Sequence, residues 1–150
     1  MVVRSTIYSD IIFDSELEIL QVIWKQKPTD SVFVDTYLHG LNFVQEVKPI
    51  QYYCTDLTQS GPLDREQEEW LNNFFYGKLH ETLKAEVFVA VVFSDEHFKA
   101  IVTNYTATKL ANLYDFLHFN YFTEKQEAYF WLESVKKGQD AILFPAFQYK

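Results

Sequence analysis

The sequence contains little of several residue types on which common functional sites depend. It has one cysteine, Cys54, in 150 residues, so it can form neither an intrachain disulfide nor a zinc site built on cysteines. Its four glycines leave little material for a glycine-rich phosphate loop. Lys and Arg total 13 against 21 Asp and Glu, a net charge of -8. This acidic balance argues against a nucleic-acid-binding face.

Long hydrophobic runs are also missing. No apolar run approaches the roughly 18 residues that a membrane helix needs, and the longest, Val87–Phe93, has the length of a buried strand. The N-terminal MVVRSTIYSD lacks the charged-then-apolar pattern of a signal peptide. We therefore expect a cytoplasmic location without integral membrane association, in keeping with an unpaired thiol in a reducing compartment.

Apolar residues make up 48% of the chain and charged residues 23%. These values are typical of a globular protein and exclude intrinsic disorder. The length predicts a single domain over residues 1–150, with a folded core at about 7–137 and an apolar C-terminal tail at 139–150. Aromatic residues make up 18%, and any that the core does not bury would mark a contact surface.

Hydrophobic periodicity predicts strands and helices in alternation. We expect strands at 7–13, 17–24, 50–55, 86–93 and 116–122. Helices are expected at about 29–47, from 64 past Leu79, at 96–113 and from 123 to a stop at Gly138, with N-caps at Thr29 or Asp30, Asp64, Ser94 or Asp95, and Thr123. The order ββαβαβαβα predicts an α/β fold: a mostly parallel mixed sheet, with helices packed on it and an antiparallel hairpin strand at one edge.

Catalytic and metal-binding patterns are weak. The four histidines, His39, His80, His97 and His118, include no pair at the helical i, i+4 spacing of a metal site. Cys54 lies mid-strand, where the ordinary role is that of a small buried hydrophobe. No nucleophile elbow is present. We expect no enzyme activity, no metal and no cofactor, and keep an enzyme built from converging Asp, Glu or His side chains as a third alternative.

Three segments resemble a known family when taken with the element order. They are LEILQVIWKQ in the opening hairpin, YYCTDLTQSGPLDREQEEWLNNFF around the second helix, and FNYFTEKQEAYFWLESV, in which Phe122 ends a strand before Ala128, Trp131 and Leu132. Together they resemble the SpoIIAA-like members of the STAS superfamily, particularly the small uncharacterised bacterial ones, over Tyr8–Lys137. The resemblance implies a STAS-like fold.

The well-studied members of that family are anti-sigma factor antagonists, in which a serine opening the second helix is phosphorylated by a partner kinase. Asp56 and Leu57 match the Asp-Leu pair that precedes their loop, and Asp64 matches the Asp that opens their helix. Arg65 stands where the family has its phosphorylatable serine, so the resemblance implies a site without the phosphoswitch. The simpler interpretation makes Asp56 a turn residue and Asp64 a helix cap.

The leading functional hypothesis is a non-enzymatic regulatory or interaction module that binds a protein partner, itself included as a homodimer. Its partner-binding residues would be Asp56, Thr58, Ser60, Asp64 and Arg65, in the loop and at the start of the second helix. Four further residues, Trp70, Phe74, Tyr129 and Phe130, form a possible apolar contact surface. The alternative is a small-molecule or lipid carrier, which requires an apolar pocket of several hundred Å³.

Overall fold

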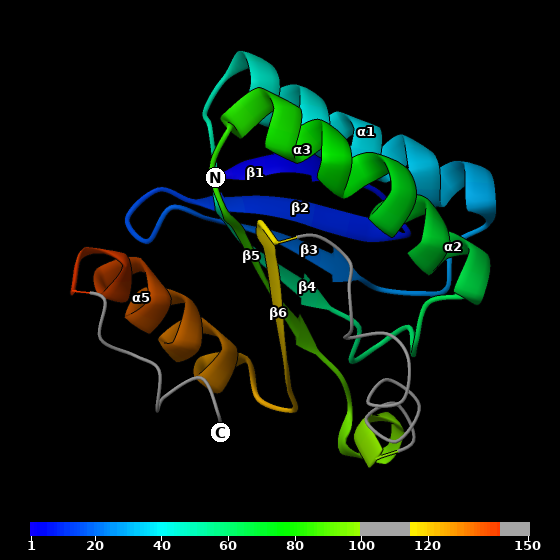
Figure 1. The fold of residues 1–150 in the computed structure, drawn as a ribbon. Helices are drawn as coiled ribbons and strands as arrows, with labels where there is room; N and C mark the ends of the chain where they lie inside the picture. Colours follow the sequence, from blue (N-terminus) through cyan, green and yellow to red (C-terminus); the bar gives the residue numbers. More distant parts are fainter. Residues whose placement is uncertain (100–114, 142–150) are drawn as a thin grey trace.

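A six-stranded mixed sheet lies at the centre of the fold, with its strands in the order β1-β2-β3-β4-β5-β6 (Figure 1). The structure, a computed structural model, describes residues 1–99 and 115–141. β1 and β2 pair antiparallel, as do β2 and β3, whereas β3, β4, β5 and β6 run parallel. The α/β class and the mixed sheet are confirmed. The strands are β1 (Val2–Ser5), β2 (Ser9–Asp14), β3 (Ile19–Trp24), β4 (Tyr52–Asp56), β5 (Val87–Val92) and β6 (Leu117–Phe122).

Helices cover both faces of this sheet (Figure 1). One face lies under α1 (Asp30–Glu46) and under a continuous helical segment made of α2 (Arg65–Trp70), the π-helical turn η1 (Leu71–Phe75) and α3 (Tyr76–Leu83). The other face lies under α5 (Lys125–Ala141), which contacts β4, β5 and β6. All six residues of β5 are therefore buried, as its continuous apolar sequence predicts.

The two faces have separate hydrophobic cores. The core under α1 and α3 is the larger and is rich in aromatic rings: Trp24 stacks on Phe33 at 5.7 Å between ring centroids, and Phe33 meets Tyr37 at 4.9 Å. The core under α5 is smaller and includes Cys54 and Ala128, both 0% exposed. The burial of Cys54 confirms its expected role as a small hydrophobe.

The N-terminal part of the sheet differs from the sequence prediction. Val2–Ser5 forms the edge strand β1, which the sequence analysis missed, so the hairpin strand β2 lies inside the sheet. The strand expected at 7–13 begins at Ser9, and Ile7 is 74% exposed in the preceding turn. The prediction failed because Val2 and Ile7 are exposed, so their apolar character does not report the buried pattern.

Helix starts follow the predicted caps except in the last helix. Thr29 caps α1 by accepting from the Val32 amide at 3.3 Å, and Ser94 accepts from His97 and Phe98 at the start of the helical residues 95–99. α5 begins at Lys125, so Thr123 is not its cap, and Gly138 does not end it because the helix continues to Ala141. Gly138 is buried inside that helix, where a glycine is tolerated at a cost in propensity.

Two predicted segments, the remainder of the 96–113 helix and the tail from 142 to 150, lie outside the described residues. Within residues 1–99 and 115–141, none of the helices combines the length and the apolar character needed to cross a membrane.

Candidate functional site

Asp56 is the last residue of β4 and is placed at the carboxyl end of the parallel strands, where ligands of open α/β sheets commonly bind. The sequence analysis assigned it to the loop, but its side chain is only 7% exposed. One carboxylate oxygen, Oδ1, accepts from the Thr58 amide at 2.9 Å and from the Thr58 hydroxyl at 2.7 Å. The other, Oδ2, pairs with Lys125 Nζ at 2.9 Å. Asp56 therefore joins the loop to the start of α5.

Lys125 extends this pair into a polar network on the α5 face of the sheet. Its ammonium group donates to Gln21 Oε1 at 3.3 Å, and the Gln21 amide nitrogen donates to the Tyr129 hydroxyl at 3.0 Å. Gln21 belongs to β3 and is 7% exposed. The network thus links β3, β4 and α5, and each of these polar groups has a partner, as buried polar groups require.

The ionisation of Asp56 depends on those partners. Burial alone would raise the pKa of this carboxyl. The hydrogen bonds from Thr58 and the charge of Lys125 together outweigh that effect, so the pKa lies below its ordinary value of 3.8. Cys54, on the same face, has its pKa raised to about 12 by burial. At neutral pH the site therefore contains a carboxylate and a protonated thiol, and a protonated thiol is a poor nucleophile.

The start of α2 is anchored by a second set of contacts. Asp64 is the N-cap and forms a capping box with Gln67, whose Oε1 accepts from the Asp64 amide at 3.1 Å. Gln67 also donates to Asp30 Oδ1 at 3.2 Å, and Asp64 pairs with Lys27 at 2.8 Å. The N-terminus of α2 is thereby held against the N-terminus of α1, and Asp64 is a cap, as the simpler interpretation predicted.

Between these two anchors, the 57–64 loop follows a defined path. Leu57 donates its amide to Val92 O of β5 at 2.8 Å, and Gly61 donates to Leu57 O at 3.0 Å. Gly61 has a φ of +81°, which favours glycine, and a Cβ placed there would lie 3.5 Å from the His97 ring. The loop therefore packs against β5 and against the helical turn that follows it.

The five predicted partner-binding residues divide into inward-facing and outward-facing groups. Asp56 is turned into the protein, and Ser60 is half-buried and donates to its neighbouring Gly61 carbonyl at 3.0 Å. Thr58, Asp64 and Arg65 are exposed. The Arg65 side chain is 84% exposed, and its ion pair with Glu69 spans 3.6 Å. Three of the five residues thus present an exposed hydroxyl, carboxylate and guanidinium along the loop and the start of α2.

The four aromatic residues predicted as an apolar contact surface lie on helices that cover opposite faces of the sheet. Trp70 and Phe74 stack on each other at 5.3 Å beside α1. Tyr129 and Phe130 belong to α5, where Tyr129 packs against the sheet and Phe130 is 63% exposed. They do not form one continuous surface.

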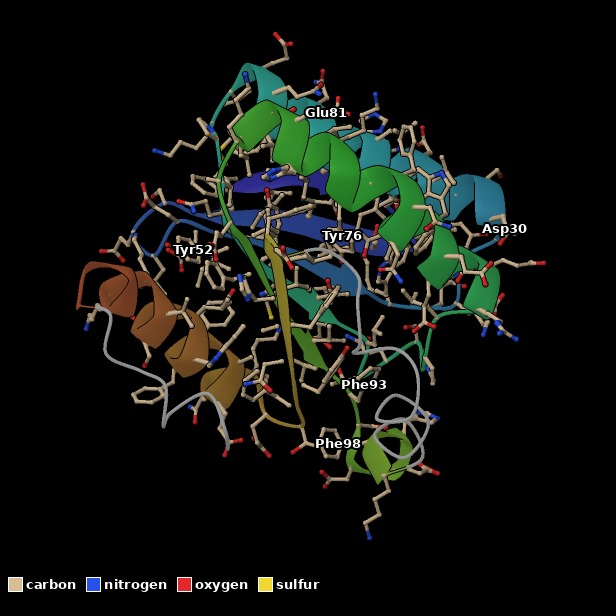
Figure 2. The ribbon with its side chains drawn as sticks, in the orientation of Figure 1. Asp30, Tyr52, Tyr76, Glu81, Phe93 and Phe98 are labelled. Carbon is tan, nitrogen blue, oxygen red and sulfur yellow. The ribbon has the colours of Figure 1, made fainter. Side chains whose placement is uncertain are left out.

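A cavity of about 60 Å³ lies between β4–β6 and the α2–η1–α3 segment. Its walls include Leu71, Tyr76, Phe93 and Phe119, and Tyr76 and Phe93 are labelled in Figure 2, where Tyr76 lies between the helical segment and the sheet. Pockets that hold drug-sized molecules have volumes of about 300–1,000 Å³, so this cavity suits a much smaller group. Across the described ranges, no cluster of three or more His, Cys, Asp or Glu is placed to hold a metal ion.

Sequence reasoning missed Lys125, Gln21 and Tyr76 as site residues. For Lys125 a signal was present, because a cation in the first turn of a helix opposes the helix dipole and so needs another reason to be there. The reason is its pair with Asp56. Gln21 and Tyr76 carried no such signal, because only tertiary packing brings them to the network and the cavity.

Comparison of the chain with family models, with curated proteins and with solved structures found no match.

Proposed function

We propose that the chain is a non-enzymatic, STAS-like interaction module that binds a protein partner through the 57–64 loop and the first turn of α2. One observation carries the proposal: an exposed loop is fixed at both ends, by Asp56, Thr58 and Lys125 on one side and by the Asp64–Gln67 capping box on the other. A surface ordered before binding loses less conformational entropy on association.

The exposed chemistry of this surface suits a polar partner. Thr58 and Arg65 present a hydroxyl and an almost fully exposed guanidinium, and α2 adds the exposed carboxylates of Glu66 and Glu69. Arginine is enriched among residues that dominate binding energy at interfaces, because its planar fork donates several hydrogen bonds at once. We therefore assign the largest single contribution to Arg65.

The family resemblance also favours the 57–64 loop and the first turn of α2 as the partner-binding region. In the STAS superfamily members that the sequence resembles, the loop and the start of the second helix carry the regulated partner contact. Here Arg65 replaces the serine, so the proposed module binds without a phosphorylation switch at that position. The matching segments and the six-stranded mixed α/β sheet support this assignment.

The test is a quantitative affinity capture from native lysate with three baits: the full chain, the Arg65→Glu variant and the Lys137→Glu variant. The two substitutions change the net charge equally, and Lys137 is exposed on α5, away from the loop. We expect a specific protein to be retained by the full chain and by Lys137→Glu, and to fall at least about tenfold with Arg65→Glu, as a lost interfacial arginine predicts. Retention of the same proteins by all three baits, or of none above the empty matrix, contradicts the proposal.

A further inference from the structure

The outer surface of the helix layer made by α1 and the α2–η1–α3 segment carries an apolar patch. The two lie side by side (Figure 1), and the Gln45 side chain of α1 donates to the Thr82 hydroxyl of α3 at 3.2 Å. Leu38, two turns before Gln45 on the same side of α1, is 41% exposed. Phe74 is 38% exposed and stacks on Trp70 at 5.3 Å. Exposed apolar side chains that gather in one place mark a contact surface.

Gly77 extends this patch along α3, because it follows Phe74 by three residues and lies on the same side of the helical segment. A glycine inside a helix lowers its stability relative to alanine. Among the described residues, no group packed against the helix lies within 4 Å of a Cβ placed at Gly77, and its φ is not positive. Neither space nor backbone conformation within the chain therefore requires glycine here. The close approach of another molecule does, because glycine has no side chain.

Charge is unevenly distributed along the same segment. α2, with the sequence REQEEW, has three carboxylates and one guanidinium. α3 and its C-cap Lys84 have two ammonium groups and one carboxylate. The first end is therefore net negative and the second net positive. Two copies of the segment attract each other when they pack antiparallel, because each negative end then lies beside the positive end of the other copy.

The antiparallel arrangement also matches in shape. A twofold axis that places Phe74 of one copy over Gly77 of the other repeats the same contact in the opposite direction, as a symmetric dimer requires. Each ring then fills the space left by the absent side chain. The same axis brings the exposed Glu66 of each copy close to the exposed Lys84 of the other, because Glu66 precedes Phe74 by eight residues and Lys84 follows Gly77 by seven (74 − 66 = 8; 84 − 77 = 7).

We propose that two copies of the chain form a twofold dimer through their α2–η1–α3 segments, with each Phe74 ring packed on Gly77 of the other copy and with Glu66 paired to Lys84 across the axis. A second copy fits this surface because the surface supplies both halves of each match: ring and gap, carboxylate and ammonium group. The centre of the dimer lies two to three turns beyond the first turn of α2 that the proposed protein partner contacts. Its tests use the purified chain alone, so either proposal can fail without the other.

Sedimentation velocity of the purified full chain over a range of protein concentrations tests for the dimer. We expect the mass to rise from that of the monomer to twice that value, with a dissociation constant on the order of ten micromolar for so small an interface. Gly77→Gln fills the gap and should weaken dimerisation at least about tenfold. Its thermal midpoint, measured at dilutions where the chain is monomeric, should stay unchanged or rise, because glutamine is the better helix former. A monomer at every concentration, or an unchanged affinity in Gly77→Gln, overturns the proposal.

Phe74→Gln and Phe130→Gln are a matched pair, because each removes an exposed ring from a helix and the two helices cover opposite faces of the sheet. We expect Phe74→Gln to weaken dimerisation at least about tenfold and Phe130→Gln to leave it unchanged. Equal effects of the two variants on the dissociation constant would place the interface elsewhere and overturn the assignment.

Charge reversal tests the antiparallel arrangement. Glu66→Lys places two ammonium groups opposite each other across the axis, and Lys84→Glu places two carboxylates there, so each variant alone should dimerise at least about tenfold more weakly. An equimolar mixture of the two variants restores opposite charges in both pairs and should dimerise about as tightly as the natural protein. A mixture that dimerises no more tightly than either variant alone contradicts the antiparallel arrangement.

Discussion

The two faces of the sheet differ in the size and composition of their hydrophobic cores. The face under α1 and α3 buries large aromatic rings, with Trp24 and Phe33 both 0% exposed. The smaller core under α5 contains Cys54, Ala90 and Ala128, all 0% exposed, beside rings such as that of Trp131, and this face adds the Asp56–Lys125 network at the strand ends. Large rings contribute most of the buried apolar area, whereas small residues let a helix approach the sheet closely. We infer that the first face supplies most of the stability and the second fixes the shape of the 57–64 loop.

The largest predicted effect tests the aromatic face. Phe33→Ala removes a ring that contacts Trp24, Tyr37 and Trp70. It should lower the free energy of unfolding by about 3–5 kcal/mol, because it leaves a cavity in a packed core. The measurement is urea denaturation followed by circular dichroism.

Phe130→Ala is the matched control on α5, where the ring is 63% exposed. It should change the free energy of unfolding by no more than about 0.5 kcal/mol. Comparable losses in the two variants would contradict the assignment of stability to the first face.

The next effect compares two ion pairs at the same end of the sheet. Lys125→Met leaves Asp56 buried without its cation and should lower the free energy of unfolding by about 1–3 kcal/mol. The loss should be smaller than for a fully buried pair because the Lys125 side chain is 41% exposed. Lys27→Met removes the partner of Asp64, whose side chain is 50% exposed, and should cost about 0–1 kcal/mol. Urea denaturation of both variants at neutral pH measures the difference, and equal costs would contradict it.

The Asp56–Lys125 pair predicts how the stability of the protein changes with pH. The pKa of Asp56 is lower in the folded protein than its ordinary value of 3.8, so the unfolded state binds more protons between those two values. The contribution of Asp56 is therefore fully present above about pH 5 and is lost as the pH falls through the folded pKa. Stability curves of the natural protein and of Lys125→Met, measured from about pH 3 to 7, should converge at low pH and diverge as the pH rises. Parallel curves would show that Lys125 does not set this ionisation.

The smallest effect compares two tyrosine hydroxyls. Tyr129→Phe removes the acceptor of the Gln21 amide and should lower the free energy of unfolding by about 1 kcal/mol. Tyr76→Phe removes a hydroxyl from the wall of the cavity, where water can replace the lost oxygen, and should leave the free energy of unfolding unchanged or raise it slightly. A larger loss for Tyr76→Phe would mean that its hydroxyl is paired in solution.

The features that sequence predicted well are those that local chemistry determines. The continuous apolar run of β5, the Thr29 and Ser94 caps and the Asp64 cap all depend on residues within one or two turns. The Asp56 environment depends on Lys125, 69 positions away in sequence (125 − 56 = 69), and periodicity does not report such a contact. The edge strand β1 escaped prediction because an edge strand that is half exposed carries no regular apolar alternation.

The most direct test of the account is the amide exchange rate of Thr58 at neutral pH, measured by NMR in the natural protein and in Lys125→Met. The Thr58 amide donates to Asp56 Oδ1, whereas the Glu68 amide donates to Asp64 O in the capping turn of α2 and serves as an internal reference. We predict that loss of Lys125 speeds exchange at Thr58 at least about tenfold relative to Glu68, as expected when a local structure opens more often. An unchanged ratio of the two rates would contradict the claim that α5 fixes the loop.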